Sequence, residues 1–331
     1  MKGSTTDPLR SGAEAAFRAG VAAADPGPAV ARWLRAHPHA AAPSGCLAMA
    51  AVGKAAPAMA AGALEERSPD PRHSLIVTKD GHGGDAPAGV PLRETGHPTP
   101  DTRSLAVGEA LLDLAAGLGE DDELLLLVSG GASALAEALP EAIPLADWMA
   151  ASEALVGGGL PIGAINAVRK HASRLKGGRL ARTAAPARVT ALLLSDVIGD
   201  DPAVIGSGPA APDPTTYADA LGHADSLPGL PQSVRAHMER GARGEIPETP
   251  KPGELPGATC HVVVGNGSAL EAAAEHLRAA GFRPWICTSR LQGEAREVAR
   301  ALAAVALESA DTGRPVAPPV AFLWGGEPTV T

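Results

Sequence analysis

Residues 123–135 read Glu-Leu-Leu-Leu-Leu-Val-Ser-Gly-Gly-Ala-Ser-Ala-Leu, and this stretch decides the fold class. The short apolar run Leu124–Val128 is typical of a strand that is covered on both faces of a sheet. Small residues follow at once and predict a tight turn from this strand into a helix. Backbone N–H groups in such a turn can approach a phosphate closely, and a helix N-terminus adds partial positive charge. The stretch therefore predicts an α/β protein with a candidate phosphate-binding loop at Ser129, Gly130, Gly131 and Ser133.

A second interpretation of this loop stays open. Two glycines after a strand often serve only the close packing of the next helix. The chain also contains no G-x-x-x-x-G-K-[ST] pattern, so the loop is not a Walker A motif.

Further apolar runs predict the rest of the architecture. Helical stretches separate them, which indicates a mostly parallel sheet in an α/β/α sandwich. A Pro-rich stretch between Pro228 and Pro256 then predicts a connection, after which the pattern restarts. We therefore expect an N-terminal α/β/α domain at residues 1–250 and a second, incomplete α/β domain at residues 251–331. The expected strands are Cys46–Val52, Ser74–Thr78, Glu123–Ser129, Val189–Val197, His261–Gly265, Arg283–Ser289 and Val320–Trp324.

Helices are expected on either side of these strands. Leu9–Ala36 has helical periodicity with a break at Asp25–Pro28, which predicts two helices. Ser268–Ala280 is expected to join two strands into one βαβ unit, and Gly293–Leu307 supplies a further helix.

Composition excludes several classes of protein. The net charge of −9 argues against a nucleic-acid-binding surface, which needs a basic face. The three cysteines, Cys46, Cys260 and Cys287, are widely spaced and form no CxxC pair, so they indicate neither a zinc site nor a disulfide framework. No signal peptide and no apolar run of roughly 20 residues occurs, so we expect a cytoplasmic protein without membrane contact.

Two charged positions at predicted strand ends are candidates for catalysis. Lys54 follows the strand that ends near Val52, at the edge where α/β proteins gather their ligands, and its ammonium group could neutralise a transferring phosphoryl group. Asp196 emerges from another buried run, and Asp200 follows it in a turn. Such carboxylates could hold Mg²⁺ or accept a proton from a substrate hydroxyl. A lone surface lysine and turn aspartates are also common without any function.

The most basic stretch of this acidic chain is Ile165–Leu180. It contains Arg169 and Lys170 beside apolar residues at helical spacing. One interpretation is a clamp on a substrate carboxylate or a nucleotide phosphate, and the other is an ordinary solvated helix face.

Taken in order, these segments resemble the glycerate 2-kinase family, the MOFRL group whose members often carry the older label hydroxypyruvate reductase. The matching segments are GKAAPAMA (53–60), VTKDGHGG (77–84), GHPTPD (96–101), LVSGGASAL (127–135), INAVRKHASRLKGGRLA (165–181), LSDVIGDDPAVIGSGPAAPDPTT (194–216) and GEAREVA (293–299).

The resemblance implies phosphorylation of D-glycerate at its 2-hydroxyl with ATP and Mg²⁺, in a cleft between two α/β domains. From its place in the turn after Asp196, Asp200 is a further candidate metal ligand. By the same resemblance, Lys54 would face the phosphate and Asp196 would act on the glycerate hydroxyl or the metal. The Ser129–Ser133 loop, Arg169 and Lys170 would flank them. A homodimer is one oligomeric state that the sequence allows.

Two departures from the family pattern bear on these expectations. Ala132 stands where the family loop more often has a third glycine, which matters if that position needs a positive φ. The family also continues beyond the Gly-Gly-Glu-x-Thr-Val-Thr segment into an Arg-Asn-x-Glu motif that this chain lacks. We therefore expect a C-terminally truncated kinase that is poorly active or inactive.

Two other functions compete with the kinase. An oxidoreductase acting on hydroxypyruvate would need a dinucleotide fingerprint, but Gly265-Asn266-Gly267-Ser268-Ala269-Leu270 lacks the third glycine. No acidic residue ends the following strand to bind a ribose. A non-catalytic protein that binds a nucleotide or a sugar acid is the second alternative.

Overall fold

The structure is a computed structural model that describes residues 8–330, and in it the chain forms two compact units. The larger unit contains Pro26–Leu194 and Asp201–Val263. The smaller unit contains the residues up to Asp25, the short segment Ser195–Asp200 and the residues from Val264 onward. Each unit is described by itself.

A six-stranded sheet forms the centre of the larger unit, in the order β3-β2-β1-β4-β5-β6. The strand pairs from β3 through β5 are all parallel, as expected for strands that alternate with helices. The predicted α/β class with a mostly parallel sheet is therefore confirmed. The strands are β1 (Leu47–Val52), β2 (Ser74–Lys79), β3 (Leu92–Thr95), β4 (Glu123–Val128), β5 (Arg188–Leu194) and β6 (Ala258–Val264).

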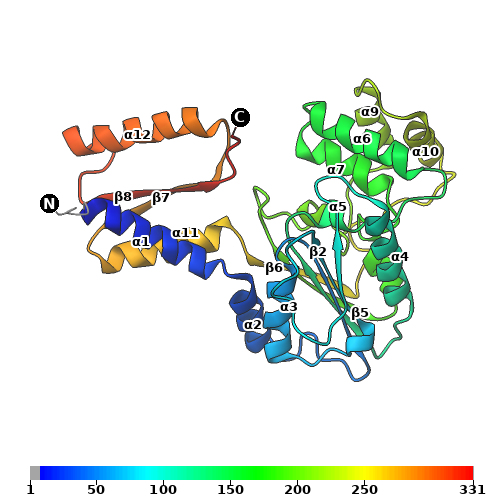
Figure 1. Cartoon of the computed structure of the whole chain (residues 1–331). Helices are drawn as coiled ribbons and strands as arrows, with labels where there is room; N and C mark the ends of the chain where they lie inside the picture. The colour runs from blue at the N-terminus through cyan, green and yellow to red at the C-terminus, as the bar shows by residue number, and fades with distance from the viewer. Residues whose placement is uncertain (1–7, 331) are drawn as a thin grey trace. The chain divides into compact units, whose positions relative to one another are not determined.

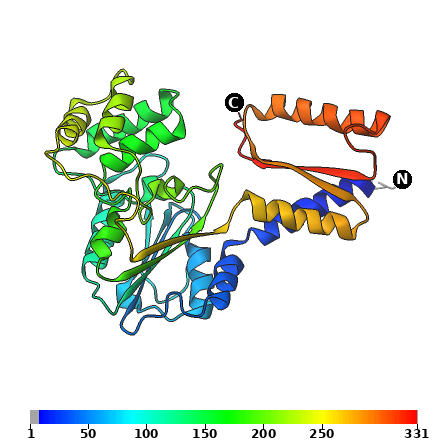
Figure 2. The same ribbon diagram turned by 180° about the vertical axis from the view of Figure 1, so that it is seen from behind.

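Helices cover both faces of this sheet (Figures 1 and 2). On one face, α2 (Pro26–Ala36) and α3 (Ala56–Glu66) bury Leu34 and Met59 against Met49 of β1 and Leu125 of β4. On the other face lie α4 (Thr102–Ala116) and α8 (Arg179–Ala184). Because alternate side chains of a strand point to opposite faces, β4 is apolar throughout and is buried along its whole length.

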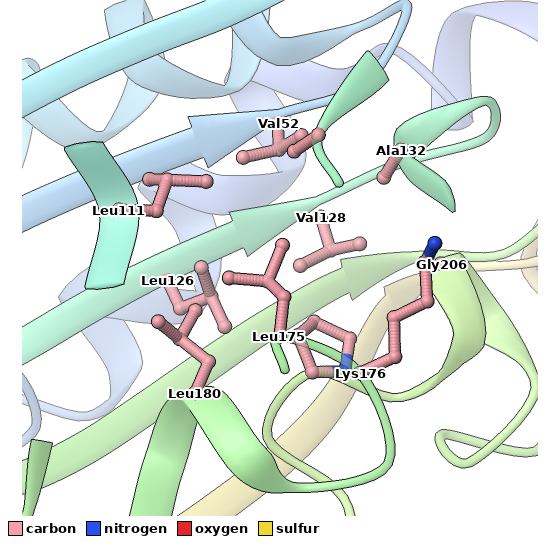
Figure 3. A pocket seen from close by; sticks show the side chains of 11 residues that line it. Val52, Leu111, Leu126, Val128, Ala132, Leu175, Lys176, Leu180 and Gly206 are labelled. Carbon is pink, nitrogen blue, oxygen red and sulfur yellow. The ribbon is translucent and has the colours of Figure 1, made fainter. Parts of the chain in front are cut away.

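An apolar pocket lies on the α4 and α8 face (Figure 3). Leu111, Leu126, Val128 and Leu180 line it together with the side chain of Lys176. Its volume of about 20 Å³ is enough for roughly one water molecule. The pocket is therefore a small packing defect of the core and not a substrate site.

A second helical cluster completes the larger unit. It buries Trp148, Val168, Tyr217 and Met238 in a core of its own. Two short 3-10 helices, η1 (Pro71–His73) and η2 (Ile205–Ser207), and the single turn α5 (Ala132–Leu135) connect the elements. The helices of the cluster are α6 (Leu145–Gly157), α7 (Ile162–His171), α9 (Tyr217–Asp225) and α10 (Gln232–Ala242), which gather at one end of the unit in Figure 1.

The smaller unit is built on the two parallel strands β7 (Arg283–Leu291) and β8 (Val320–Gly326). The helices α1 (Pro8–Ala23) and α11 (Asn266–Ala279) cover one face, and α12 (Ala295–Thr312) lies on the other (Figures 1 and 2). At Gly20, an added Cβ would lie 2.9 Å from the carbonyl oxygen of Ala269, so only glycine allows this close helix packing. Only Ser309 of α12 is buried, so this helix contributes little to the core.

The observed units differ from the predicted boundary at residue 250. The strand β6 lies beyond that boundary, yet it is the edge strand of the larger sheet. The helix α1 lies before residue 250 in the sequence, yet this helix packs against α11 of the smaller unit. The Pro-rich stretch belongs to the larger unit, where the carbonyl oxygen of Pro250 accepts a hydrogen bond from the N–H of Asp213 at 2.8 Å. It is therefore not a connection between the units.

Three local features also differ from what the sequence pattern indicates. The predicted βαβ unit does not form, because β6 joins the larger sheet while β7 pairs with β8. The edge strand β3 was not predicted, since Leu-Arg-Glu-Thr is short and mostly polar. The basic stretch is not one helix, because Gly177 and Gly178 adopt φ values of 58° and 80° between α7 and α8.

Candidate active site

Hydrogen bonds connect the turns after β1 and β4 at the carboxyl edge of the larger sheet. The hydroxyl of Ser129 accepts a hydrogen bond from the N–H of Ala55 at 3.0 Å. The carbonyl oxygen of Gly130 accepts one from the N–H of Lys54 at 3.0 Å. A Cβ on Gly53, whose φ is 136°, would overlap Ser129. Ser129 and Gly130 therefore hold the backbone that presents Lys54.

The side chains of Lys54 and His97 both lie close to Gly131. A Cβ added to Gly131 would lie 3.2 Å from Nε2 of His97 and 3.3 Å from Cε of Lys54. Gly131 has a φ of 87°, so it is the loop position that needs glycine. Ala132 is the first residue of α5 and is absent from the positive-φ positions, so its Cβ does not disturb the loop.

The electrostatic environment of this loop is cationic. Partial burial, together with the positive charges of Lys54 and Lys79, lowers the pKa of His97, which favours its neutral form. Among residues 8–330, neither lysine has a hydrogen-bonded or ion-paired partner for its ammonium group. Two unpaired cations beside a glycine turn suit an anionic ligand such as a phosphate.

A chain of hydrogen bonds connects the loop to α7. Oγ of Ser133 lies 2.9 Å from Oγ of Ser207, and Ser207 donates to Oδ1 of Asn166 at 2.8 Å. Because the single hydroxyl proton of Ser207 is used for Asn166, Ser133 donates to Ser207 and keeps its own oxygen as an acceptor. Ser207 is buried and has a φ of 61° between two glycines that also have positive φ. Such a backbone is uncommon for serine and often accompanies function.

Arg169 lies one helical turn after Asn166 on α7 and is only partly exposed. Burial lowers the pKa of its guanidinium group, and the negative charge of Glu137 opposes this effect. Glu137 is itself bound to the ammonium group of the buried Lys176. In the part of the chain that the structure describes, the Arg169 guanidinium has no hydrogen bond or ion pair of its own. Arg169 is therefore available to bind a carboxylate or a phosphate.

Lys170 occupies a different environment from its neighbour. Its ammonium group lies 3.2 Å from Oδ1 of Asp213, and both side chains are buried. Burial alone would raise the pKa of Asp213, but the charge of Lys170 and hydrogen bonds from Thr215 lower it overall. The geometry argues against the predicted ligand-binding role of Lys170, because its charge already neutralises a buried carboxylate.

Asp196 and Asp200 belong to the smaller unit. Asp196 is exposed, and Asp200 is half-buried with a φ of 53°. Both carboxylate oxygens of Asp200 lie 3.0 Å from the position that a Cβ would take at Gly265, directly before α11. Within residues 8–330, no basic side chain pairs with either aspartate. Two unpaired carboxylates fit the oxygen ligands that Mg²⁺ prefers.

Three residues of the site region were not predicted to take part. His97 lies in the matching segment GHPTPD (96–101), but only the structure shows that it lies near Gly131 and Lys54. Ser207 and Asn166 were not singled out, although Gly206-Ser207-Gly208 is a sequence signal for unusual backbone angles. Their hydrogen bonds join segments that lie far apart along the chain, so no local pattern could reveal them.

These features define an α/β/α protein with a cationic glycine turn at the carboxyl edge of a parallel sheet. The chain belongs to the DUF4147 family, described as a domain of unknown function, whose family model matches residues 12–239. Glycerate 2-kinases of this type are its relatives, so the family resemblance found in the sequence is confirmed.

Three comparisons illustrate the relationship. The chain is 43% identical over 318 residues to "Putative hydroxypyruvate reductase" of Agrobacterium vitis, covering 95% of this chain and 69% of that protein. It is 39% identical over 284 residues to "Glycerate 2-kinase" of Pyrococcus horikoshii, covering 85% and 63%. A crystal structure of glycerate kinase from Thermotoga maritima matches with a TM-score of 0.85 and 34% identity, over 97% of this chain and 75% of that one. The chain thus spans roughly two thirds of the length of these curated relatives.

Within residues 8–330, every helix is too short or too polar to span a lipid bilayer.

Proposed function

We propose that this protein is a glycerate 2-kinase, which transfers the terminal phosphoryl group of ATP to the 2-hydroxyl of D-glycerate. The observation that carries the proposal is the ammonium group of Lys54, which has no partner among residues 8–330 and lies beside Gly131, at the edge of the sheet where ligands of α/β proteins bind. The names of the relatives in Pyrococcus horikoshii and Thermotoga maritima support the same reaction.

The proposed role of Lys54 is to stabilise the negative charge of the transferring phosphoryl group. Little covalent chemistry falls to the protein in phosphoryl transfer, so position and charge dominate catalysis. Gly131 brings the loop backbone close to Lys54, and Ser129 and Gly130 fix the turn. Ser133 offers a hydroxyl oxygen as an acceptor.

Arg169 is proposed to bind an anionic group of glycerate or ATP. A guanidinium group donates two parallel hydrogen bonds to a carboxylate or a phosphate, and Arg169 has no competing acidic partner among residues 8–330. Lys170 is not part of this proposal, since Asp213 holds its charge.

Asp196 and Asp200 are proposed to hold Mg²⁺. The ion would neutralise phosphate charge when it is bound with ATP. Asp196 also remains the candidate to accept the proton of the glycerate 2-hydroxyl, because an exposed carboxylate can fill either role.

The oxidoreductase alternative has little support from the fold. A dinucleotide-binding unit needs the glycine turn between two strands of one sheet, but β6 and β7 belong to different sheets. A binding protein without catalysis remains the competing proposal, and turnover separates it from the kinase. We also propose a cytoplasmic location. Light scattering of the purified chain would distinguish a monomer from a homodimer.

The decisive experiment measures ADP release from ATP with D-glycerate, in the presence and absence of Mg²⁺. We expect turnover that depends on both glycerate and Mg²⁺, at a rate below that of the Thermotoga maritima enzyme, and its loss in Lys54→Ala. The matched control is Arg243→Ala, which removes an exposed positive charge at the end of α10. The Thermotoga maritima enzyme serves as the positive control for the assay.

ATP binding without turnover would support the binding protein and reject the kinase. Glycerate-dependent formation of NADH from NAD⁺ would instead support the oxidoreductase. Equal activity of Lys54→Ala and Arg243→Ala would remove Lys54 from the mechanism.

A further inference from the structure

Three potential metal ligands meet at the amino edge of the larger sheet, the edge opposite the glycine loop. Cys46 directly precedes β1, and His73 directly precedes β2, its parallel neighbour. Asp70 caps the 3-10 helix η1 that ends at His73. The spacing of these residues along the chain does not indicate a metal site, because it matches no known ligand pattern.

The distances between the ligand atoms fit a metal ion. Sγ of Cys46 lies 3.6 Å from Nδ1 of His73, and this Nδ1 lies 3.4 Å from Oδ2 of Asp70. All three atoms lie within 4.8 Å of one another. In a tetrahedral zinc site, the bonds are about 2.3 Å to sulfur and about 2.0–2.2 Å to nitrogen and oxygen. This geometry separates the sulfur and nitrogen ligands by about 3.6 Å, and the nitrogen and oxygen ligands by about 3.4 Å. The measured distances agree with these separations.

The charges around the group also favour a cation. The carboxylate of Asp122 accepts a hydrogen bond from the N–H of Cys46 at 2.7 Å, so two carboxylates lie near the sulfur. One basic group competes: the guanidinium of Arg72 pairs with both carboxylate oxygens of Asp70, through Nη2 to Oδ2 at 2.7 Å and Nε to Oδ1 at 3.1 Å. The Arg72 side chain is 84% exposed, and a carboxylate oxygen has a second lone pair. A metal bound through the second lone pair of Oδ2 can therefore share the carboxylate with Arg72.

The alternative interpretation is a weak hydrogen bond from Cys46 to His73 beside an ordinary ion pair. That interpretation explains the distances without a metal, but it predicts no affinity for thiophilic cations. The ligand types are those of zinc proteins, since thiolate, imidazole and carboxylate are the groups that bind Zn²⁺. His73 is exposed and the other two are half-buried, so an ion can reach the group from solvent.

We propose that Cys46, Asp70 and His73 form a binding site for a thiophilic divalent cation of the Zn²⁺ class. Sγ, Oδ2 and Nδ1 are the three protein ligands, and water completes the tetrahedron. Binding replaces the thiol proton of Cys46, which is released to solvent. The ion joins the first residues of two neighbouring strands and is independent of the proposed kinase site.

The first test is a titration of the full purified chain with Co²⁺, which reports a cysteine ligand through a thiolate-to-cobalt charge-transfer band. We expect this band to appear and Zn²⁺ to displace it. Cys46→Ser should abolish the band, and His73→Ala should weaken binding at least tenfold. The matched controls are Cys287→Ser and His276→Ala, which change an exposed cysteine and an exposed histidine of the smaller unit.

A second test needs no variant and uses the native thiols as internal controls. Alkylation of each cysteine is followed by peptide mass spectrometry with and without Zn²⁺. We expect Zn²⁺ to slow the alkylation of Cys46 and to leave that of Cys287 unchanged. An equal alkylation rate of Cys46 in both conditions, or an unchanged cobalt band in Cys46→Ser, would overturn the proposal.

Discussion

Replacing Gly131 with alanine tests whether the left-handed loop beside Lys54 matters for turnover. Gly131 has a φ of 87°, and alanine in this region costs about 1–2 kcal/mol. The new Cβ would lie 3.1 Å from Cδ2 of His97 and 3.3 Å from Cε of Lys54, so both side chains must shift by a few tenths of an ångström. Such a shift of a charged group should cost about tenfold in kcat, equivalent to about 1.4 kcal/mol.

Gly229→Ala is the matched control. Gly229 has a φ of 88°, and no atom lies within 4 Å of an added Cβ. The two variants therefore carry the same backbone penalty, but only Gly131→Ala disturbs other side chains. Urea unfolding should give both variants a similar loss of about 1–2 kcal/mol in the free energy of unfolding. The ADP-release assay should show reduced kcat for Gly131→Ala alone.

Two results would refute this reasoning. If Gly131→Ala and Gly229→Ala have the same kcat, the closeness of Lys54 and His97 to the loop does not affect catalysis. If Gly131→Ala loses far more stability than its control, the effect belongs to packing of the core and not to the loop backbone.

Three further predictions test other parts of the larger unit. Ser207→Ala and Ser207→Gly should lower kcat equally, because Ser133 loses its acceptor in both. The free energy of unfolding should be about 1–2 kcal/mol higher for the glycine variant than for the alanine variant, because glycine relieves the positive φ. Equal stability of the two variants in urea would contradict the backbone argument. Lys170→Met should lower the free energy of unfolding by about 3–5 kcal/mol, since it leaves the carboxylate of Asp213 buried without Lys170. The KM values of the folded enzyme should not change. A tenfold rise in KM without a loss of stability would restore Lys170 as a ligand. Burial lowers the pKa of His237 from 6.5 to about 4, so between these values the unfolded chain binds more protons than the folded chain. The free energy of unfolding should therefore rise between pH 4 and pH 6.5 by up to about 1.4 kcal/mol per pH unit. Urea unfolding of His237→Gln should show a smaller rise with pH, and an unchanged rise would exclude His237 as the cause.

Local periodicity was sufficient to predict most elements of the fold. The apolar run of β4 is continuous because the strand is buried on both faces, and the break at Asp25 separates α1 from α2 as expected. What periodicity could not predict is pairing. Which strand lies beside another depends on contacts between segments that are far apart along the chain. In the sequence, β6 resembles the first strand of a new domain because it follows the Pro-rich stretch, but in the structure it is the edge strand of the larger sheet.

In the candidate site, too, local sequence predicts some features, whereas others depend on distant contacts. Lys54 and the glycine loop could be predicted, because each occupies a strand end where local sequence determines the turn. The environment of Lys170 could not be predicted, since its partner Asp213 lies far along the chain. Adjacent positions of one basic helix thus differ in role: Arg169 has no acidic partner among residues 8–330, whereas Lys170 is already neutralised.

The contact between α1 and α11 has a consequence for synthesis of the protein. These helices pack through Gly20 and Ala269, but α1 leaves the ribosome well before its partner α11. At about 5–20 residues per second, its partner follows roughly 250 residues and some 12–50 s later. The larger unit can complete most of its sheet during this interval, whereas α1 has no native partner. The smaller unit therefore assembles only after α11 has been made, from segments translated before and after the larger unit.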